Sequence, residues 1–145
     1  MRSPSKYFIT AVAFWVVVDY STAFNPDWQR WLEHMPLIWL FYLGYPLLFT
    51  LLIYRLKWRR WQLFMAMLFM TFFLEMVIFN NTLLTTFPLL LVMIPIAIAL
   101  YSFITYVPVW IAEGDLRNKW KLASLLTFVW LIVSILNYQS TISGG

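Results

Sequence analysis

The chain has 145 residues, of which 63% are apolar and only 11% are charged, whereas an average soluble domain carries roughly 25% charged residues. It has the length of one domain but too few polar side chains to cover a core in water, so its composition favours a lipid bilayer. The absence of cysteine excludes disulfides, iron–sulfur clusters and thiol catalysis, and the basic loops of a membrane protein explain the net charge of +4 better than nucleic-acid binding does.

Apolar runs long enough to cross a membrane occur five times. A helix needs about 20 apolar residues to cross roughly 30 Å of hydrocarbon. The runs lie at about residues 7–24, 36–54, 61–79, 87–112 and 121–138. Pro36 and Pro88 lie just inside predicted helix starts, while Pro46, Pro95 and Pro108 are expected to bend the helices that contain them. The predicted fold is an all-α bundle of five transmembrane helices that forms a single domain.

The first run, 7–24, has a competing interpretation as a cleaved signal peptide. Basic residues precede it, and the triplet Ser21-Thr22-Ala23 resembles a small-x-small cleavage site. Asp19 and Tyr20 interrupt the approach to that site. We therefore expect a retained helix.

The basic residues fall on alternate connections between the predicted helices. One side of the membrane would hold Arg2, Lys6, Arg55, Lys57, Arg59, Arg60, Arg117, Lys119 and Lys121. The opposite side would hold only Arg30. Because cytoplasmic loops carry an excess of Lys and Arg, the pattern predicts a cytoplasmic N-terminus and an external C-terminus. We expect a multi-pass protein of a plasma (inner) membrane or of an organelle membrane.

The connection 55–61 is basic, with interleaved tryptophan. Its Arg55, Lys57, Arg59 and Arg60 could hold anionic lipid headgroups or an acidic partner. Anchoring of the topology is the simpler interpretation. A loop this short, pressed against a bilayer, is not expected to bind nucleic acid.

Two carboxylates lie inside predicted helices, Asp19 in the first and Glu75 in the third. An ionisable residue inside a membrane is costly and indicates a functional site by default. Asp19 lies about 18 Å and Glu75 about 21 Å along their helices from the inner side, at 1.5 Å per residue, so both reach the outer third. The structural alternatives are hydration of Asp19 near the headgroups or its bonding to Ser21 or Thr22, and a protonated Glu75 bonded to a neighbouring helix.

Amide and imidazole groups are predicted at the same level, at the outer ends of helices three and five and in the loop 25–35. If helices one, three and five are neighbours, these groups and the two carboxylates form one outward-facing polar pocket. Its predicted residues are Asp19, Glu75, His34, Asn80, Asn81 and Asn137, with Trp15, Tyr20, Trp39, Tyr42 and Tyr45 in the wall. A lone loop histidine is more often a surface residue, and no HxxxH or ExxH pair predicts a metal site.

The fifth predicted helix carries a polar seam at a spacing close to 3.5 residues. The seam consists of Thr127, Ser134, Asn137 and Thr141, with Trp130 on the same face. Such a stripe predicts packing against a neighbouring helix.

Three classes of function remain open. Small size, short loops and the absence of a catalytic motif favour a non-catalytic subunit or accessory protein of a membrane complex, bound to other polypeptides or to copies of itself. One alternative is a small membrane enzyme that acts on a lipid or isoprenoid at the outer leaflet, with Glu75 and Asp19 as acid and base and aromatic rings facing a carbocation. The other is an oligomeric transporter or ion-conducting protein that uses these acids as a proton or cation site. The sequence indicates no particular cofactor.

Overall fold

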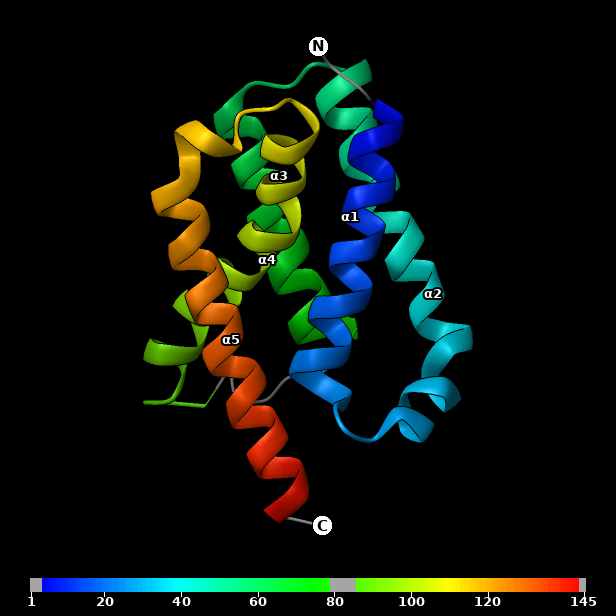
Figure 1. The fold of residues 1–145 in the computed structure, drawn as a ribbon, viewed down its shortest axis with the longest axis vertical. Coiled ribbons are helices and arrows are strands. Elements are labelled where there is room, and N and C mark those ends of the chain that lie inside the picture. The colour runs from blue at the N-terminus through cyan, green and yellow to red at the C-terminus, as the bar shows by residue number, and fades with distance from the viewer. Residues whose placement is uncertain (1–3, 79–85, 144–145) are drawn as a thin grey trace.

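A computed structural model describes residues 4–78 and 86–143, and within these ranges the chain is helical and contains no strand (Figure 1). The long helices are α1 (Pro4–Asp19), α2 (Trp28–Thr50), α3 (Arg60–Phe72), α4 (Leu90–Ala112) and α5 (Trp120–Ser143). Three of them continue directly into a π-helical turn: η1 (Tyr20–Phe24), η2 (Leu51–Arg55) and η3 (Phe73–Ile78). A short 3-10 helix, η5 (Leu116–Lys119), leads into α5.

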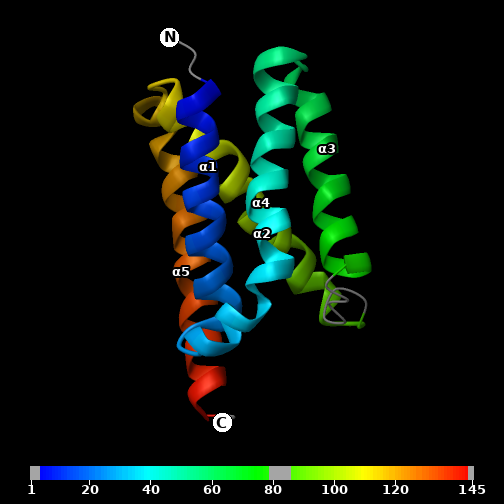
Figure 2. The same cartoon turned by 90° about the vertical axis from the view of Figure 1, so that its right-hand side faces the viewer.

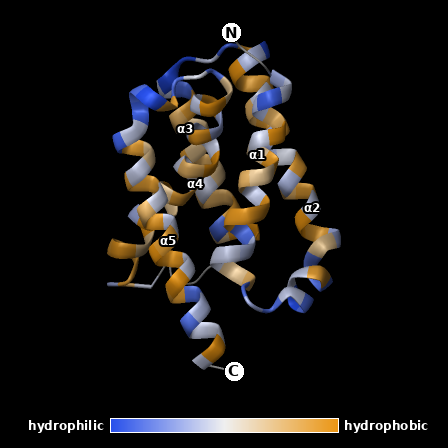
Figure 3. Ribbon diagram, viewed as in Figure 1, coloured by the Kyte–Doolittle hydropathy of each residue, from blue (hydrophilic) through white to orange (hydrophobic). Residues whose placement is uncertain are grey.

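Five helical stretches of 19 to 28 residues are long and apolar enough to cross a membrane. Large apolar side chains lie on their outer faces, such as Phe69, which is 66% exposed, and Phe128, which is 60% exposed. Apolar residues are found along much of the length of the helices (Figure 3). Lipid chains can cover such surfaces, whereas water cannot do so without cost. These findings confirm an all-α bundle with five candidate spans and are consistent with a multi-pass membrane protein.

The second helix begins eight residues earlier than predicted, at Trp28 rather than at Pro36. The side chain of Asp27 caps it by accepting a hydrogen bond from the backbone N–H of Arg30 at 3.1 Å. Pro36 therefore lies inside α2, which transmembrane helices tolerate. As a result the connection before α2 is short, and His34 lies on the helix and not in a loop.

The start of α4 and the end of α5 also differ from the predicted boundaries. Helix α4 begins at Leu90 instead of about 87, and α5 continues to Ser143 instead of ending at about 138. The hydroxyl groups at the polar end of α5 bond to carbonyls one turn back. Thr141 donates to the carbonyl of Asn137 at 2.8 Å, and Ser143 to that of Gln139 at 2.6 Å. These bonds satisfy the hydroxyls within the helix.

Helix α4 is the central element of the bundle, crossing it obliquely (Figures 1 and 2). It packs against α1, α3 and α5, while α2 packs on α1. Tyr7 of α1 and Tyr45 of α2 both reach Thr105 of α4, with the Tyr7 hydroxyl 3.3 Å from its carbonyl oxygen and the Tyr45 hydroxyl 2.7 Å from Oγ1. Helix α3 packs chiefly on α4, where Ser102 Oγ lies 3.5 Å from Met67 Sδ. The condition that helices one, three and five are neighbours is therefore met in part: the first and fifth pack together through η1 and α5, whereas α3 packs on α4 instead.

The connections 56–59 and 113–119 lie at one end of the bundle, together with the start of α1 (Figure 1), and hydrophilic residues colour that end (Figure 3). We call this the basic end and define it by Lys6, Arg55, Lys57, Arg59, Arg60, Arg117, Lys119 and Lys121. The opposite end holds the connection 25–27 between η1 and α2. The alternation of charge predicted from the sequence is therefore also a separation in space.

Candidate functional site

A pocket of about 530 Å³ lies in the half of the bundle opposite the basic end. Every long helix or its π-helical extension contributes to its wall, and α4 and the first helix with η1 contribute most of the residues. Most of the lining is apolar, as at Ile38, Leu100 and Ile104. The ionisable side chains among its lining residues are Asp19, His34, Glu75 and Tyr101.

The structure brings together four of the residues predicted for a pocket at this level. Asp19, Glu75, His34 and Trp15 all line it. Tyr20 and Asn137 lie elsewhere: the Tyr20 ring packs 5.1 Å from that of Trp31, and Asn137 bonds to the backbone. The predicted residues Asn80 and Asn81 lie outside the described ranges.

Asp19 is the last residue of α1, and its half-buried carboxyl group is held by α2. The hydroxyl of Tyr42 donates a hydrogen bond of 2.5 Å to Asp19 Oδ2, and the indole N–H of Trp31 donates to the Tyr42 oxygen at 3.0 Å. Ser21 and Thr22, the partners suggested by sequence proximity, donate instead to the Val18 carbonyl at 3.1 and 2.7 Å. A chain of three polar groups thus fixes the orientation of this carboxyl group.

Glu75 lies in the π-helical turn η3 and is held by α4. The hydroxyl of Tyr101 donates a hydrogen bond of 2.9 Å to Glu75 Oε1, and Tyr101 is itself buried. Each of the two acids therefore accepts a hydrogen bond from a tyrosine on a different helix. Within a membrane, such interhelical bonds both satisfy the acid and fix its position.

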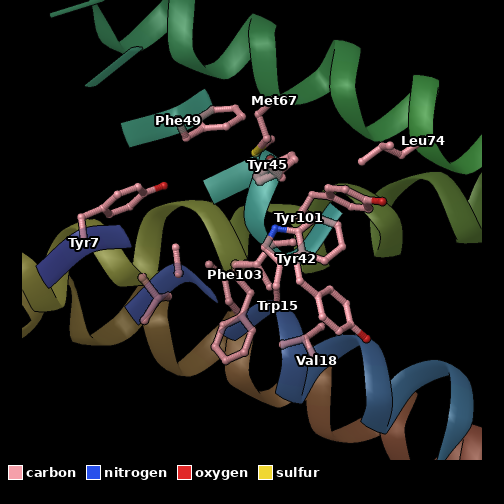
Figure 4. Packing of buried hydrophobic residues seen from close by; sticks show 14 of the residues in the cluster. Tyr7, Trp15, Val18, Tyr42, Tyr45, Phe49, Met67, Leu74, Tyr101 and Phe103 are labelled. Carbon is pink, nitrogen blue, oxygen red and sulfur yellow. The ribbon is translucent and has the colours of Figure 1, made fainter. Parts of the chain in front are cut away.

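The ring of Trp15 contacts the tyrosine of each tyrosine–carboxyl pair. It is only 4% exposed, and its centroid lies 5.0 Å from that of Tyr45, 5.8 Å from that of Tyr101 and 6.3 Å from that of Tyr42 (Figure 4). Edge-to-face packing of this kind stabilises aromatic pairs. Its indole N–H is buried and has no acceptor among the described residues, which is uncommon for a buried donor.

His34 is exposed on α2 and lines the rim of the pocket. Its Nδ1 lies 2.7 Å from the Arg30 carbonyl oxygen. Because a carbonyl can only accept, Nδ1 carries the hydrogen, and Nε2 of the neutral ring is left as an acceptor. Arg30 closes the same corner, with its guanidinium donating to the Ala23 carbonyl at 2.6 Å and lying 5.0 Å over the Phe24 ring.

The polar seam of α5 packs partly as predicted. Trp130 donates from its indole N–H to Ser21 Oγ at 2.8 Å, and Asn137 donates to the carbonyls of Ser21 and Asn25 at 3.3 and 3.2 Å. The hydroxyls of the three remaining seam residues donate to carbonyls of α5 itself. Asn137 therefore joins α5 to η1 and the residue after it.

Sequence reasoning missed Tyr101 and the whole contribution of α4 to the pocket. Tyr101 lies in the middle of a 23-residue apolar helix. A hydroxyl group at that depth needs a hydrogen-bond partner inside the protein. This requirement could have linked Tyr101 to Asp19 or Glu75 from the sequence alone, because few other polar groups lie at the same depth in the predicted helices.

The remaining candidate ligand groups are those for metal ions and for lipid headgroups. Among the described residues, no group of three or more His, Asp or Glu side chains is placed to hold a metal ion. The predicted headgroup ligands Arg55, Lys57, Arg59 and Arg60 are exposed at the basic end.

Comparisons with models of protein families, with curated proteins and with solved structures found no match.

Proposed function

We propose that this chain binds an amphiphilic molecule, a lipid or an isoprenoid, with its polar end between Asp19 and Glu75, and that these two carboxyl groups exchange protons with it. One observation carries the proposal. Asp19 of α1 and Glu75 of η3 line the same pocket, although α4 lies between the helices that carry them. Intramembrane acids are rare and costly, so two in one pocket favour a function.

The size and lining of the pocket suit such a ligand. Small-molecule sites commonly enclose about 300–1,000 Å³, have mainly apolar walls and hold a few converging polar groups. The pocket measures about 530 Å³. Its apolar residues, such as Leu100 and Ile104, can contact hydrocarbon, while His34 and the two acids supply the polar edge.

The paired acids support proton transfer as the chemistry. One carboxylic acid can donate a proton to one atom of the ligand while the other carboxylate removes a proton from another. Tyr42 and Tyr101 act as positioning residues, because their hydroxyls hold the two acids. The nearby rings of Trp15 and Tyr101 can stabilise a developing positive charge through their faces.

The proposal includes an orientation in the membrane. If the basic end is cytoplasmic, as the excess of Lys and Arg there indicates, the N-terminus is cytoplasmic and the C-terminus external. The pocket then lies in the outer half of the bilayer. The ligand would enter from the outer leaflet.

Deuterium incorporation tests the proposed chemistry whichever lipid or isoprenoid is the substrate. The protein, reconstituted in nanodiscs made with a total membrane lipid extract, is incubated in D₂O, and the extracted lipids are analysed by mass spectrometry. We expect the wild type to introduce deuterium into a discrete lipid or isoprenoid species. Glu75→Gln and Asp19→Asn should each reduce that incorporation by roughly 100-fold or more, the usual contribution of a positioned acid or base.

The matched control is Glu33→Gln, which changes an exposed glutamate that is not among the lining residues. It should incorporate deuterium as the wild type does. Incorporation no greater than in empty nanodiscs, or full incorporation by Glu75→Gln, would contradict the proposal.

The hypothesis of an accessory subunit remains a prediction with its own test. Native mass spectrometry of the protein taken from its own membrane in mild detergent should show other polypeptides in fixed ratio if it is correct. Arrival of the protein alone, carrying a lipid or isoprenoid adduct, would contradict it and support the pocket. The transporter hypothesis predicts ion or solute flux in proteoliposomes above the protein-free level, and unchanged flux would contradict that hypothesis.

A further inference from the structure

A second cavity, of about 590 Å³, lies between α4 and α5 in the half of the bundle that includes the basic end. Its lining is almost entirely apolar, with Val107 and Ile111 on one side and Ala123 and Phe128 on the other. Ser124 and Thr127 are the polar lining residues, and the Thr127 hydroxyl already donates to the Ala123 carbonyl at 2.7 Å. We call this cavity the α4–α5 groove.

Basic residues alternate in sequence with lining residues where the groove approaches the basic end. Leu116 and Trp120 line the groove, while Arg117, Lys119 and Lys121 are their neighbours in sequence. Lys121 Nζ lies 5.7 Å over the ring of Trp120, which places this ammonium group beside the groove.

Two acids lie on the same connection and reduce its charge. Asp115 accepts a hydrogen bond from the Asn118 side chain at 2.7 Å, and Glu113 is the residue directly after α4. Three basic residues against these two acids still leave a positive rim.

We propose that the α4–α5 groove binds one acyl chain of an anionic phospholipid, with the phosphate held by Arg117, Lys119 and Lys121. The occupant follows from the two properties together. An apolar groove suits a hydrocarbon chain, and basic residues at its surface end favour a negatively charged headgroup. The site is separate from the pocket of Asp19 and Glu75, so it does not depend on the function proposed for that pocket.

The basic connection between α2 and α3 provides a matched control. Arg59 and Arg60 also lie at the basic end, but, unlike Lys119 and Lys121, they are not next in sequence to a residue that lines the groove. A general positive surface would attract anionic lipid at both places. A site built from a groove and its rim would lose lipid only when its own residues change.

Native mass spectrometry of the full chain, released from mixed vesicles of phosphatidylglycerol and phosphatidylcholine, tests the proposal. We expect the wild type to retain one phosphatidylglycerol molecule in preference to phosphatidylcholine. Lys119→Gln with Lys121→Gln should weaken that preference by roughly 10- to 30-fold. Ser124→Trp, which fills the groove without changing charge, should also abolish it.

The control variant Arg59→Gln with Arg60→Gln removes the same charge and should retain the lipid. Equal loss in the control and in the lysine variant would overturn the proposal, because it would indicate a general surface effect. Retention by Ser124→Trp would also overturn it, because the chain would then not occupy the groove. An absence of preference in the wild type contradicts it directly.

Discussion

Replacing Tyr42 by phenylalanine removes a single hydroxyl group from the wall beside the pocket. That hydroxyl donates to Asp19 Oδ2 at 2.5 Å and accepts from Trp31 Nε1 at 3.0 Å. The residue is fully buried, so water does not replace either bond. The Tyr42 ring lies 6.3 Å from that of Trp15 and 5.9 Å from that of Trp39, and we expect phenylalanine to keep this packing.

The expected loss of stability follows from these two bonds. Hydrogen bonds between transmembrane helices contribute about 0.6 kcal/mol on average and up to about 1.7 kcal/mol. The bond to Asp19 joins α2 to α1, whereas the bond from Trp31 lies within α2. The loss of both predicts a decrease of about 1–3 kcal/mol in the free energy of unfolding. Steric trapping in bicelles measures this quantity without denaturant.

Tyr138→Phe is the control, because Tyr138 is 42% exposed on α5. It should unfold with the free energy of the wild type. The reasoning is refuted if Tyr42→Phe is as stable as Tyr138→Phe, because the Trp31–Tyr42–Asp19 chain would then contribute nothing to the packing of α2 on α1.

Two further predictions concern the contact of α5 with η1 and the volume of the pocket. Asn137→Leu should lower the free energy of unfolding by about 1 kcal/mol, because it removes the bonds to the Ser21 and Asn25 carbonyls. The control is Gln139→Leu, which changes an exposed neighbour. Equal free energies of unfolding for the two variants would show that these bonds do not stabilise the bundle. Ala97→Trp should place a large side chain in the pocket and reduce binding of decylammonium, measured by calorimetry in nanodiscs, by tenfold or more. Binding equal to that of the wild type would show that the ligand lies elsewhere.

The sequence predicted the five helices well, because each must bury its backbone polar groups in a run of apolar residues. The early start of α2 was missed because Pro36 resembles a first helical residue, whereas the helix begins eight residues earlier, where Asp27 caps it. The π-helical turns η1, η2 and η3 carry no pattern that separates them from the α-helices they extend.

The site was predicted in part. The cost of an acid in a membrane identified Asp19 and Glu75, and their similar depth predicted a common level. Hydropathy does not encode the order of helices, so the central position of α4 and the role of Tyr101 emerged only from the packing. Asn137 was placed in the pocket because of its depth, but its helix face turns it toward η1.

The central claim is that Asp19 and Glu75 face one ligand, and a double-mutant cycle on ligand affinity tests it most directly. The affinity of decylammonium, with decanesulfonate as the oppositely charged control, is measured in nanodiscs for the wild type, Asp19→Asn, Glu75→Gln and the double variant. If both acids contact one ammonium group, each single variant loses affinity and the losses depart from additivity by more than about 0.5 kcal/mol. Additive losses, or a single variant that binds as the wild type does, would contradict the claim that the two acids share one site.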